Sequence, residues 1–250
     1  MKLLRFLADG KPRYGAVEQR QVRELAGDPF DGVRFGPRSF QLEEITLLPP
    51  CEPSKIVAVG VNYRAHAKEM GRPLPADPLL FMKPPSALIG HGAAIQYPPG
   101  VSRVDHEAEL AVVIKKKIKA VSSAHAQDAI LGYTCLNDVT ARDLQHKDVQ
   151  WTRAKAFDTF APMGPWIVTD VDPADLKIEA ILNGQTKQSD TTADMIFPVP
   201  FLVSFISSIM TLFPGDVITT GTPPGVSPMQ RGDTIEIVIQ DIGRLTNTVR

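Results

Sequence analysis

Cysteine is scarce in this sequence, whose 250 residues include two, Cys51 and Cys135. Two cysteines in a chain of this length do not make the disulfide framework of a small secreted protein. Cys135 lies in an apolar stretch, so we expect it to be a small buried hydrophobic residue. The length is sufficient to bury a full core, in one domain or in a large domain with a small one.

An excess of charge of one sign is also missing, because 27 Lys and Arg residues face 28 Asp and Glu residues. The net charge of -1 gives no overall basic surface for nucleic acid or for an anionic membrane. The one basic cluster, Lys115–Lys119, follows a predicted strand and contains no interleaved aromatic residues. This pattern favours a solvated strand end over an RNA-binding patch.

Long apolar runs are absent, and no window approaches the length that a membrane-spanning helix needs. The segment Met1–Leu7 carries charge and has neither a long apolar core nor a small-residue cleavage site, so it is not a signal peptide. We therefore expect a soluble, cytoplasmic protein.

A pair of acidic residues in an apolar strand is the first pointer to chemistry. The stretch Val104–Ile114 is predicted to be one β-strand, in which Glu107 and Glu109 point to the same face. A second predicted strand, Gly132–Asp138, ends in a third carboxylate. Buried like charges must share a proton or hold a cation. Three carboxylates without clustered Cys or His favour a hard ion, Mg²⁺ first and then Mn²⁺ or Ca²⁺.

A solvated sheet face is the alternative explanation of Glu107 and Glu109, and for a Glu-x-Glu pair by itself it is the commoner one. The flanking residues Leu110–Ile114 are apolar without alternation, which predicts burial on both faces of the strand. This burial favours the metal site over the solvated face.

The order of strands and turns predicts a small N-terminal β unit followed by a larger domain. Lys2–Leu7 and Arg13–Val17 form a predicted hairpin, and strand-like pieces continue to Thr46–Leu48. The proline-rich segment Pro49–Pro53 then interrupts the pattern. We place the boundary there, which gives a β domain over residues 1–50 and a main domain over residues 51–250.

The main domain begins with an apolar strand, Lys55–Val61, and a short helix over Asn62–Met70 that Gly71 ends. His66 and Glu69 lie three residues apart on one face of that helix and can form a hydrogen bond. The following segment, 72–78, contains three prolines and cannot continue the helix. A short helix beside such a loop could move as a lid.

Further elements make the main domain mostly β, closed as a roll or sandwich. Two helices are expected, one over Ala124–Leu131 and an apolar one from Phe197 to Met210, and a helical turn over 140–145 places Arg142 and Gln145 on one face beside Asp138. The other predicted strands are Leu79–Met82, Trp166–Thr169, Lys177–Leu182 with the Asn183-Gly184 turn, Asp216–Thr220 and Thr234–Ile239.

Several separated motifs, taken in order from about Lys55 to the C-terminus, resemble the fumarylacetoacetate hydrolase family. They are Gly60-Val61-Asn62-Tyr63 with His66 and Glu69, Phe81-Met82-Lys83-Pro84, the Glu107/Glu109 strand, Asp138-Val139-Thr140-Ala141-Arg142-Asp143 with Gln145, Lys155, Met195-Ile196-Phe197, and Thr220-Gly221-Thr222-Pro223-Pro224-Gly225-Val226. Each motif is weak alone, but their shared order and spacing are specific.

This resemblance implies a mixed β-sandwich roll, a homodimer, and Mg²⁺ or Mn²⁺ held by Glu107, Glu109 and Asp138. It also implies that a histidine and a glutamate on a lid, here His66 and Glu69, supply acid–base chemistry. The remaining roles implied for this chain are catalysis by Lys155 and substrate binding by Arg142, Gln145 and Thr222. The substrate would be a small 2-oxo or enol dicarboxylate, with no nucleic acid or membrane partner.

The chain departs from the longest members of the family, which place a further metal-binding carboxylate shortly before the histidine. Here that position falls within the apolar stretch Ile56–Val61. The chain therefore resembles the short bacterial members, whose reactions include acylpyruvate hydrolysis, oxaloacetate decarboxylation and isomerisation of 2-hydroxyhepta-2,4-diene-1,7-dioate. All pass through an enolate or carbanion that a chelating divalent ion stabilises.

We predict hydrolysis of a C–C bond in an acylpyruvate-type compound during catabolism. Isomerisation or oxaloacetate-type decarboxylation is the alternative, and the difference depends on whether the lid delivers water or only a proton. A non-catalytic metal-binding module is the alternative from another class. The presence of His66, Glu69, Arg142 and Lys155 argues against a module, because a purely structural ion needs no basic residues around it.

Overall fold

The structure is a computed structural model that describes all residues from 1 to 250, and strands dominate it. The helices are α1 (Arg64–Glu69), α2 (Arg142–Lys147), α3 (Thr152–Lys155) and α4 (Val199–Ile209), with six short 3-10 turns between other elements. The strands are β1 (Lys2–Ala8), β2 (Lys11–Glu18), β3 (Gln21–Leu25), β4 (Phe35–Gln41), β5 (Thr46–Leu48), β6 (Ile56–Gly60), β7 (Leu79–Lys83), β8 (Leu88–Ile89), β9 (Ala94–Ile95), β10 (Val104–His106), β11 (Ala108–Ile114), β12 (Ile130–Asn137), β13 (Thr140–Ala141), β14 (Ala161–Val168), β15 (Lys177–Leu182), β16 (Gln185–Thr191), β17 (Val217–Thr219), β18 (Ser227–Met229), β19 (Thr234–Ile239) and β20 (Gly243–Val249).

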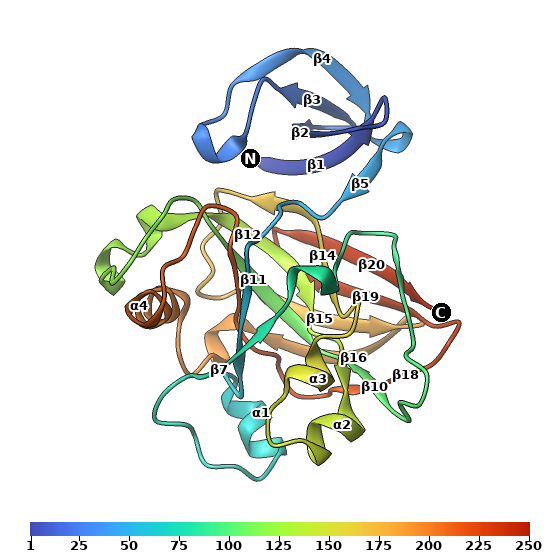
Figure 1. The fold of residues 1–250 in the computed structure, drawn as a ribbon, viewed down its shortest axis with the longest axis vertical. Coiled ribbons are helices and arrows are strands. Elements are labelled where there is room, and N and C mark those ends of the chain that lie inside the picture. The colour runs from blue at the N-terminus through green and yellow to red at the C-terminus, as the bar shows by residue number, and fades with distance from the viewer.

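These strands form three sheets, which confirms the predicted mainly β fold. The largest runs in the order β4-β3-β2-β1-β14-β12-β11-β17-β6-β7, and the second in the order β16-β15-β19-β20-β9. A third, small sheet has the order β13-β10-β18. Strands β12 and β14 pack against β19 and β20, so the two larger sheets face each other across a common core (Figure 1).

The core between the sheets explains why β11 is buried along its whole length. Val112 and Ile114 belong to the main core cluster, which also contains Ile237 of the facing sheet. Ala111 and Val113, which alternate with them, pack in a second cluster on the other face. The prediction that Leu110–Ile114 is buried on both faces is therefore confirmed.

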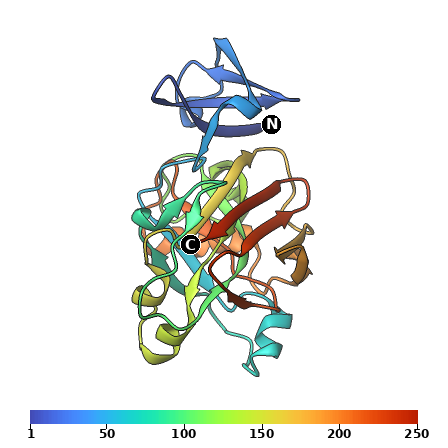
Figure 2. The same cartoon turned by 90° about the vertical axis from the view of Figure 1, so that its right-hand side faces the viewer.

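Strands β1 to β5 lie together at one end of the molecule, well separated from the helices α1, α2 and α3 at the other end (Figures 1 and 2). The predicted hairpin is present as β1 and β2, which pair in antiparallel register. Leu4, Phe6 and Val22 form a small core of their own. Leu3 pairs with Ile167 of β14, which links these strands to the main sheet.

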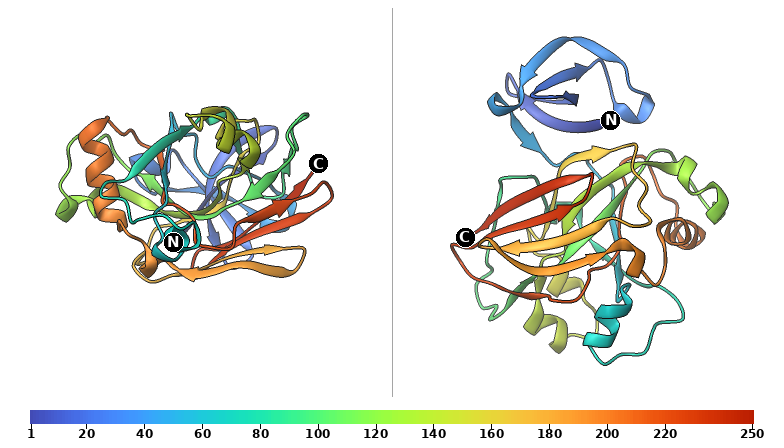
Figure 3. Two further views of the ribbon diagram at one scale, coloured as in Figure 1. Left: turned by 90° about the horizontal axis from the view of Figure 1, so that it is seen from below. Right: turned by 180° about the vertical axis from the view of Figure 1, so that it is seen from behind.

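Helix α4 confirms the predicted apolar helix and begins with proline at its first turn. Leu202, Val203 and Ile206 are fully buried, whereas Phe201 and Ile209 on its outer side are exposed. Figure 3 shows α4 on the flank of the sheets rather than between them. No helix in the structure has the length and apolar character that crossing a membrane requires.

The prediction of a helix over Ala124–Leu131 is wrong. The segment forms two 3-10 turns, Ser123–His125 and Gln127–Ala129, and then enters β12 at Ile130. The backbone of β12 pairs with β11 along its length, and Ile130 lies opposite Ile114. This ladder overrides the weak helix propensity of the alanines.

Candidate functional site

The acidic cluster lies at a break between two strands that belong to different sheets. The sequence predicted one continuous strand over Val104–Ile114, but β10 ends at His106 and β11 begins at Ala108. Glu107 occupies the break, where its N–H donates to Asn137 Oδ1 (2.9 Å) and its carbonyl accepts from Asp138 N (2.9 Å). The break lets consecutive segments of the chain join two different sheets, and it holds Glu107 beside the end of β12.

Glu107, Glu109 and Asp138 converge as predicted. One carboxylate oxygen from each lies within 4.8 Å of the others, and all three side chains are buried. The solvated-face alternative is therefore wrong for this pair, since Glu107 and Glu109 are 6% and 1% exposed. Buried carboxylates this close need compensating positive charge.

Three basic side chains supply part of that charge. Lys155 Nζ lies 2.9 Å from Glu107 Oε2 and 2.6 Å from Asp138 Oδ2, and Lys83 Nζ donates to Asp138 Oδ1 at 2.5 Å. Arg142 forms a further ion pair with Glu107. Burial by itself raises the pKa of Glu107, but Lys155 and Arg142 outweigh it and lower that pKa. In the same way Asp138 and Glu107 overcome the effect of burial and raise the pKa of Lys155.

Glu109 has no cationic partner. Its carboxylate accepts hydrogen bonds from the Thr219 hydroxyl and from Gly221 N, both neutral donors. Burial, followed by the charges of Asp138 and Glu107, raises the pKa of Glu109 well above its usual value. A divalent cation among the three carboxylates would supply the missing charge. Carboxylate oxygens suit a hard ion such as Mg²⁺ or Mn²⁺, so the donor set fits a metal site.

His66 and Glu69 form the predicted pair on α1, with His66 Nδ1 2.9 Å from Glu69 Oε2. The other carboxylate oxygen of Glu69 accepts from Gly225 N at 3.1 Å. The start of the helix is fixed separately, because Ala65 N donates to Asp194 Oδ2 (2.8 Å). The pair is less buried than the acidic cluster, with the Glu69 side chain 46% exposed.

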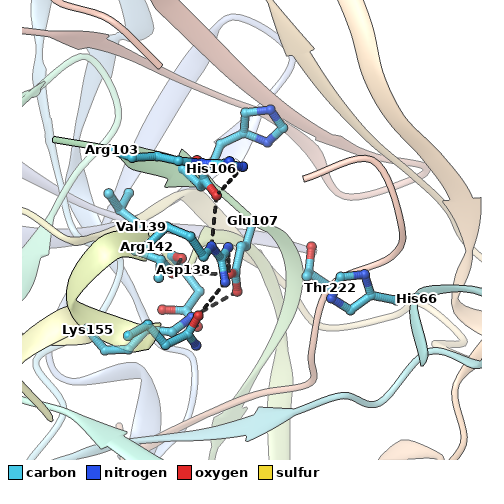
Figure 4. A network of polar contacts seen from close by, with 12 residues as sticks. His66, Arg103, His106, Glu107, Asp138, Val139, Arg142, Lys155 and Thr222 are labelled. Atoms are coloured by element: carbon cyan, nitrogen blue, oxygen red, sulfur yellow. Dashed lines mark hydrogen bonds and ion pairs between the residues drawn. The ribbon is translucent and has the colours of Figure 1, made fainter. Parts of the chain in front are cut away.

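Nearly all the predicted site residues line one pocket. Its lining includes His66, Glu107, Glu109, Asp138, Arg142, Gln145, Lys155 and Thr222. Glu69 is not in the lining and supports His66 from outside the pocket. Figure 4 shows the ion-pair network around Glu107 and Asp138, with His66 and Thr222 on a different side of Glu107 from Lys155 in this view. Phe81 and Trp151, whose rings meet edge to face at 5.2 Å, form an apolar wall.

Arg142 and Gln145 lie on one face of α2 as predicted. Arg142 Nη1 donates to Gln145 Oε1 at 2.5 Å, and Arg142 Nε donates to Asp105 Oδ2 at 2.8 Å. With Glu107 as a third acceptor, protein groups engage three of the five guanidinium N–H groups, which fixes the position of Arg142 at the pocket wall.

The sequence analysis assigned no role to three buried polar residues of the site, which are Lys83, Asp105 and Gln188. Lys83 follows an apolar strand and belongs to the Phe-Met-Lys-Pro motif, so its position was visible although its contact with Asp138 was not. Asp105 neighbours the acidic pair in sequence and binds Arg103 and Arg142. Gln188 stands in a polar hairpin arm, where nothing in the sequence distinguishes it.

Comparisons with known proteins agree with this geometry. The family model described as fumarylacetoacetate (FAA) hydrolase C-terminal matches residues 55–250, and one described as Rv2993c-like, N-terminal matches residues 1–50. The first family model thus matches most of a chain that folds as a mixed β roll with a buried acidic cluster, and this match defines the class of protein. The chain belongs to the fumarylacetoacetate hydrolase family.

Three of the proteins that this chain is similar to carry names of different reactions. The first is 2-hydroxyhepta-2,4-diene-1,7-dioate isomerase from Mycobacterium marinum, whose sequence is 47% identical. Its crystal structure superposes with a TM-score of 0.94 and covers 100% of this chain and 98% of that one. Oxaloacetate tautomerase YisK of Bacillus subtilis is 42% identical, over 92% of this chain and 81% of that protein. Maleylpyruvate hydrolase from Sphingobium sp. SYK-6, solved with manganese(II) ion and pyruvate, is 32% identical with a TM-score of 0.83, over 100% and 98%.

Proposed function

We propose that this protein is a Mg²⁺- or Mn²⁺-dependent enzyme that transfers a proton at the carbon beside the keto group of a small 2-oxo or enol dicarboxylate. The observation that carries the proposal is the convergence of two different kinds of group in one pocket. Three buried carboxylates have ligand atoms within 4.8 Å of one another and could hold a cation, and the imidazole of His66 lines the same pocket.

Glu107, Glu109 and Asp138 would hold the ion. When bound, a divalent ion supplies Lewis-acid stabilisation to the enolate form of a 2-oxo-carboxylate. Arg142 and Lys155 bring positive charge to the same wall, where they would contact oxygens of the substrate, with Gln145 and Thr222 as hydrogen-bonding neighbours.

His66 would carry the proton. Glu69 accepts a hydrogen bond from His66 Nδ1, which fixes the tautomer and leaves Nε2 free to take a proton from carbon or return it. The backbone N–H of Gly225 holds Glu69 in turn. A single positioned acid–base group is sufficient for tautomerisation or isomerisation, because both move one proton between atoms of the same substrate.

The relatives favour this reaction over C–C hydrolysis. The names of an isomerase at 47% identity and a tautomerase at 42% both describe proton shifts. Hydrolysis, which the sequence alone placed first, is the second candidate. It is favoured by the hydrolase at 32% identity, whose structure contains manganese(II) and pyruvate. Hydrolysis requires His66 to activate a water that attacks the carbonyl.

A substrate panel tests the proposal. Protein loaded with Mn²⁺ is mixed with the enol of oxaloacetate, with 2-hydroxyhepta-2,4-diene-1,7-dioate and with an acylpyruvate. The loss of each compound's ultraviolet absorbance, compared with a sample without protein, measures turnover, and mass identifies the products. Accelerated loss of absorbance without a change of mass for the first two compounds supports proton transfer. Cleavage of the acylpyruvate alone supports hydrolysis. No turnover of any compound would favour the non-catalytic metal-binding module.

Two further predictions remain proposals: a separate N-terminal domain over residues 1–50 and a homodimer. The outer side of α4 supports the second, because the exposed Phe201 stacks between the partly buried Phe197, which precedes the helix, and Phe205, with ring centroids 5.4 Å and 6.0 Å apart. Light scattering at micromolar concentration should give the mass of two chains. A single-chain mass would remove the dimer.

A further inference from the structure

Gln188 connects the acidic cluster to the loop that carries Thr222. It lies on β16 in the second sheet, and its side chain is completely buried. Gln188 Oε1 accepts from Ala108 N (2.9 Å), the residue between Glu107 and Glu109. At the other end, Gln188 Nε2 donates to Thr222 Oγ1 (2.8 Å) and to Pro223 O (2.7 Å).

The orientation of this amide is fixed by partners that have only one possible role. A backbone N–H can only donate, so the group facing Ala108 is the amide oxygen. A carbonyl can only accept, so the group facing Pro223 is the amide nitrogen. His106 Nδ1 also lies 3.1 Å from Gln188 Oε1, and because an amide oxygen can only accept, Nδ1 is the donor in that contact.

This polarity determines what Thr222 can do. Because Gln188 Nε2 donates to Thr222 Oγ1, the threonine oxygen is the acceptor in that contact, and its own hydrogen must point elsewhere. No protein group accepts a hydrogen bond from the Thr222 hydroxyl, although the residue is 5% exposed. Its side chain lines the same pocket as His66 (Figure 4).

The backbone of the loop is fitted to the same stretch of β16. Gly225 has a φ of +93°, and a Cβ added there would lie 2.2 Å from the carbonyl oxygen of Lys187. Only glycine allows that close approach. The Gly225 N–H is the group that holds Glu69. Lys187 and Gln188 thus support both Thr222 and the acceptor end of the His66–Glu69 pair.

We propose that Gln188 is a positioning residue that makes Thr222 an obligatory hydrogen-bond donor to an oxygen of the bound 2-oxo-carboxylate. Gln188 itself contacts no ligand and acts through Thr222. The inference rests on the proposed function, because it takes the anion in the pocket to be the substrate or an analogue.

Titration calorimetry of oxalate, a flat dianion that mimics an enol-carboxylate chelate, tests this role on the Mn²⁺-loaded protein. Thr222→Val removes the hydroxyl at nearly constant shape and should weaken oxalate binding roughly 10- to 100-fold, the value of one hydrogen bond to a charged group. Gln188→Met removes the donor to Thr222 without adding charge, and Gln188→Glu replaces the donor by an acceptor that attracts the Thr222 hydrogen. Both should weaken oxalate binding to a similar extent, with Mn²⁺ affinity within about threefold of wild type.

The double variant separates positioning from a structural effect. In the Thr222→Val background, Gln188→Met should change oxalate affinity by less than about threefold, because its effect passes through the hydroxyl. A further loss of oxalate affinity when Gln188→Met is added to Thr222→Val overturns the inference. Wild-type oxalate affinity in the single variant Gln188→Met overturns it as well. Wild-type affinity in Thr222→Val overturns it even if neither Gln188 variant folds. Failure of the wild-type protein to bind oxalate overturns the proposed function as well.

Discussion

The two halves of the candidate site are built in opposite ways. Glu107, Glu109 and Asp138 are buried where strands from different sheets meet, and basic side chains hold two of the three carboxylates. His66 and Glu69 lie on a helix of six residues that is followed by an exposed segment, 70–74. The first half is fixed by β-sheet hydrogen bonds and packing, whereas the second is attached by a few contacts at its ends.

This difference agrees with the two roles in the proposed function, ion binding by the carboxylates and proton transfer by His66. An ion site needs its ligands held in place before the ion arrives, and a paired strand provides that at little further entropic cost. An acid–base group must approach the substrate and then release the product, which favours an element of low local stability. If the two halves are independent, a change in one should leave the function of the other intact.

Removal of divalent ions should have the largest effect. Protein treated with a chelator should lose all turnover of the enol of oxaloacetate above the uncatalysed rate, and added Mg²⁺ or Mn²⁺ should restore it. The decrease in ultraviolet absorbance of the enol measures the rate. Circular dichroism should be unchanged, because the sheets and their core do not depend on the ion. Full activity in the chelated protein would contradict the metal site.

His66→Ala should reduce turnover by a factor on the order of 10²–10⁴, the usual contribution of a positioned general base. The affinity for Mn²⁺ should stay at the wild-type value, because His66 contacts none of the three carboxylates. Calorimetry and steady-state kinetics on the same preparation measure both quantities. A parallel loss of ion affinity would show that the two halves are not separable.

Glu109→Gln should change stability in opposite directions with and without the ion. In the metal-free protein it removes a buried carboxyl group whose raised pKa means that folding disfavours its ionised form, so the free energy of unfolding at neutral pH should rise. Mn²⁺ affinity should fall more than about tenfold, since loss of an outer-shell partner alone costs roughly that much. Thermal unfolding with and without Mn²⁺ measures both, and destabilisation of the metal-free protein would argue against an uncompensated carboxylate.

Glu69→Gln should have the smallest effect of the four. The amide has one acceptor oxygen in place of two, so it can accept from only one of His66 Nδ1 and the Gly225 N–H, and it no longer carries the charge that stabilises a protonated imidazole. We expect turnover to fall by roughly tenfold, less than for His66→Ala, with oxalate and Mn²⁺ affinities unchanged. A loss as large as that of His66→Ala would mean that Glu69 itself handles the proton.

The parts of the site that depend on local spacing could be predicted from the sequence. His66 and Glu69 are three residues apart on one helix, and Arg142 and Gln145 share a face for the same reason. Glu107 and Glu109 were predicted to act together, but the strand that carries them is interrupted at Glu107 because β10 and β11 join different sheets. That interruption depends on partners far along the chain, because His106 pairs with Ser227 and Ala108 with Asn137, and a local pattern does not contain them.

The contacts made across the fold could not be predicted. Gln188 reaches Thr222 only because β16 passes the loop after β17, and its own neighbours in sequence are ordinary hairpin residues. The helix expected over Ala124–Leu131 was lost to the β11–β12 ladder for a similar reason. Sequence patterns therefore indicated which groups the site contains, while long-range pairing determined how they are held.

In the proposed function, an ion held by the carboxylates and a proton carried by His66 act on the same substrate. The decisive measurement is the rate of ketonisation of the enol of oxaloacetate with the Mn²⁺-loaded wild type, the chelated wild type and Mn²⁺-loaded His66→Ala. We predict fast decay of the enol only for the first, with the other two slower by at least a factor on the order of 10². Equal rates for wild type and His66→Ala, or for loaded and chelated protein, would contradict it.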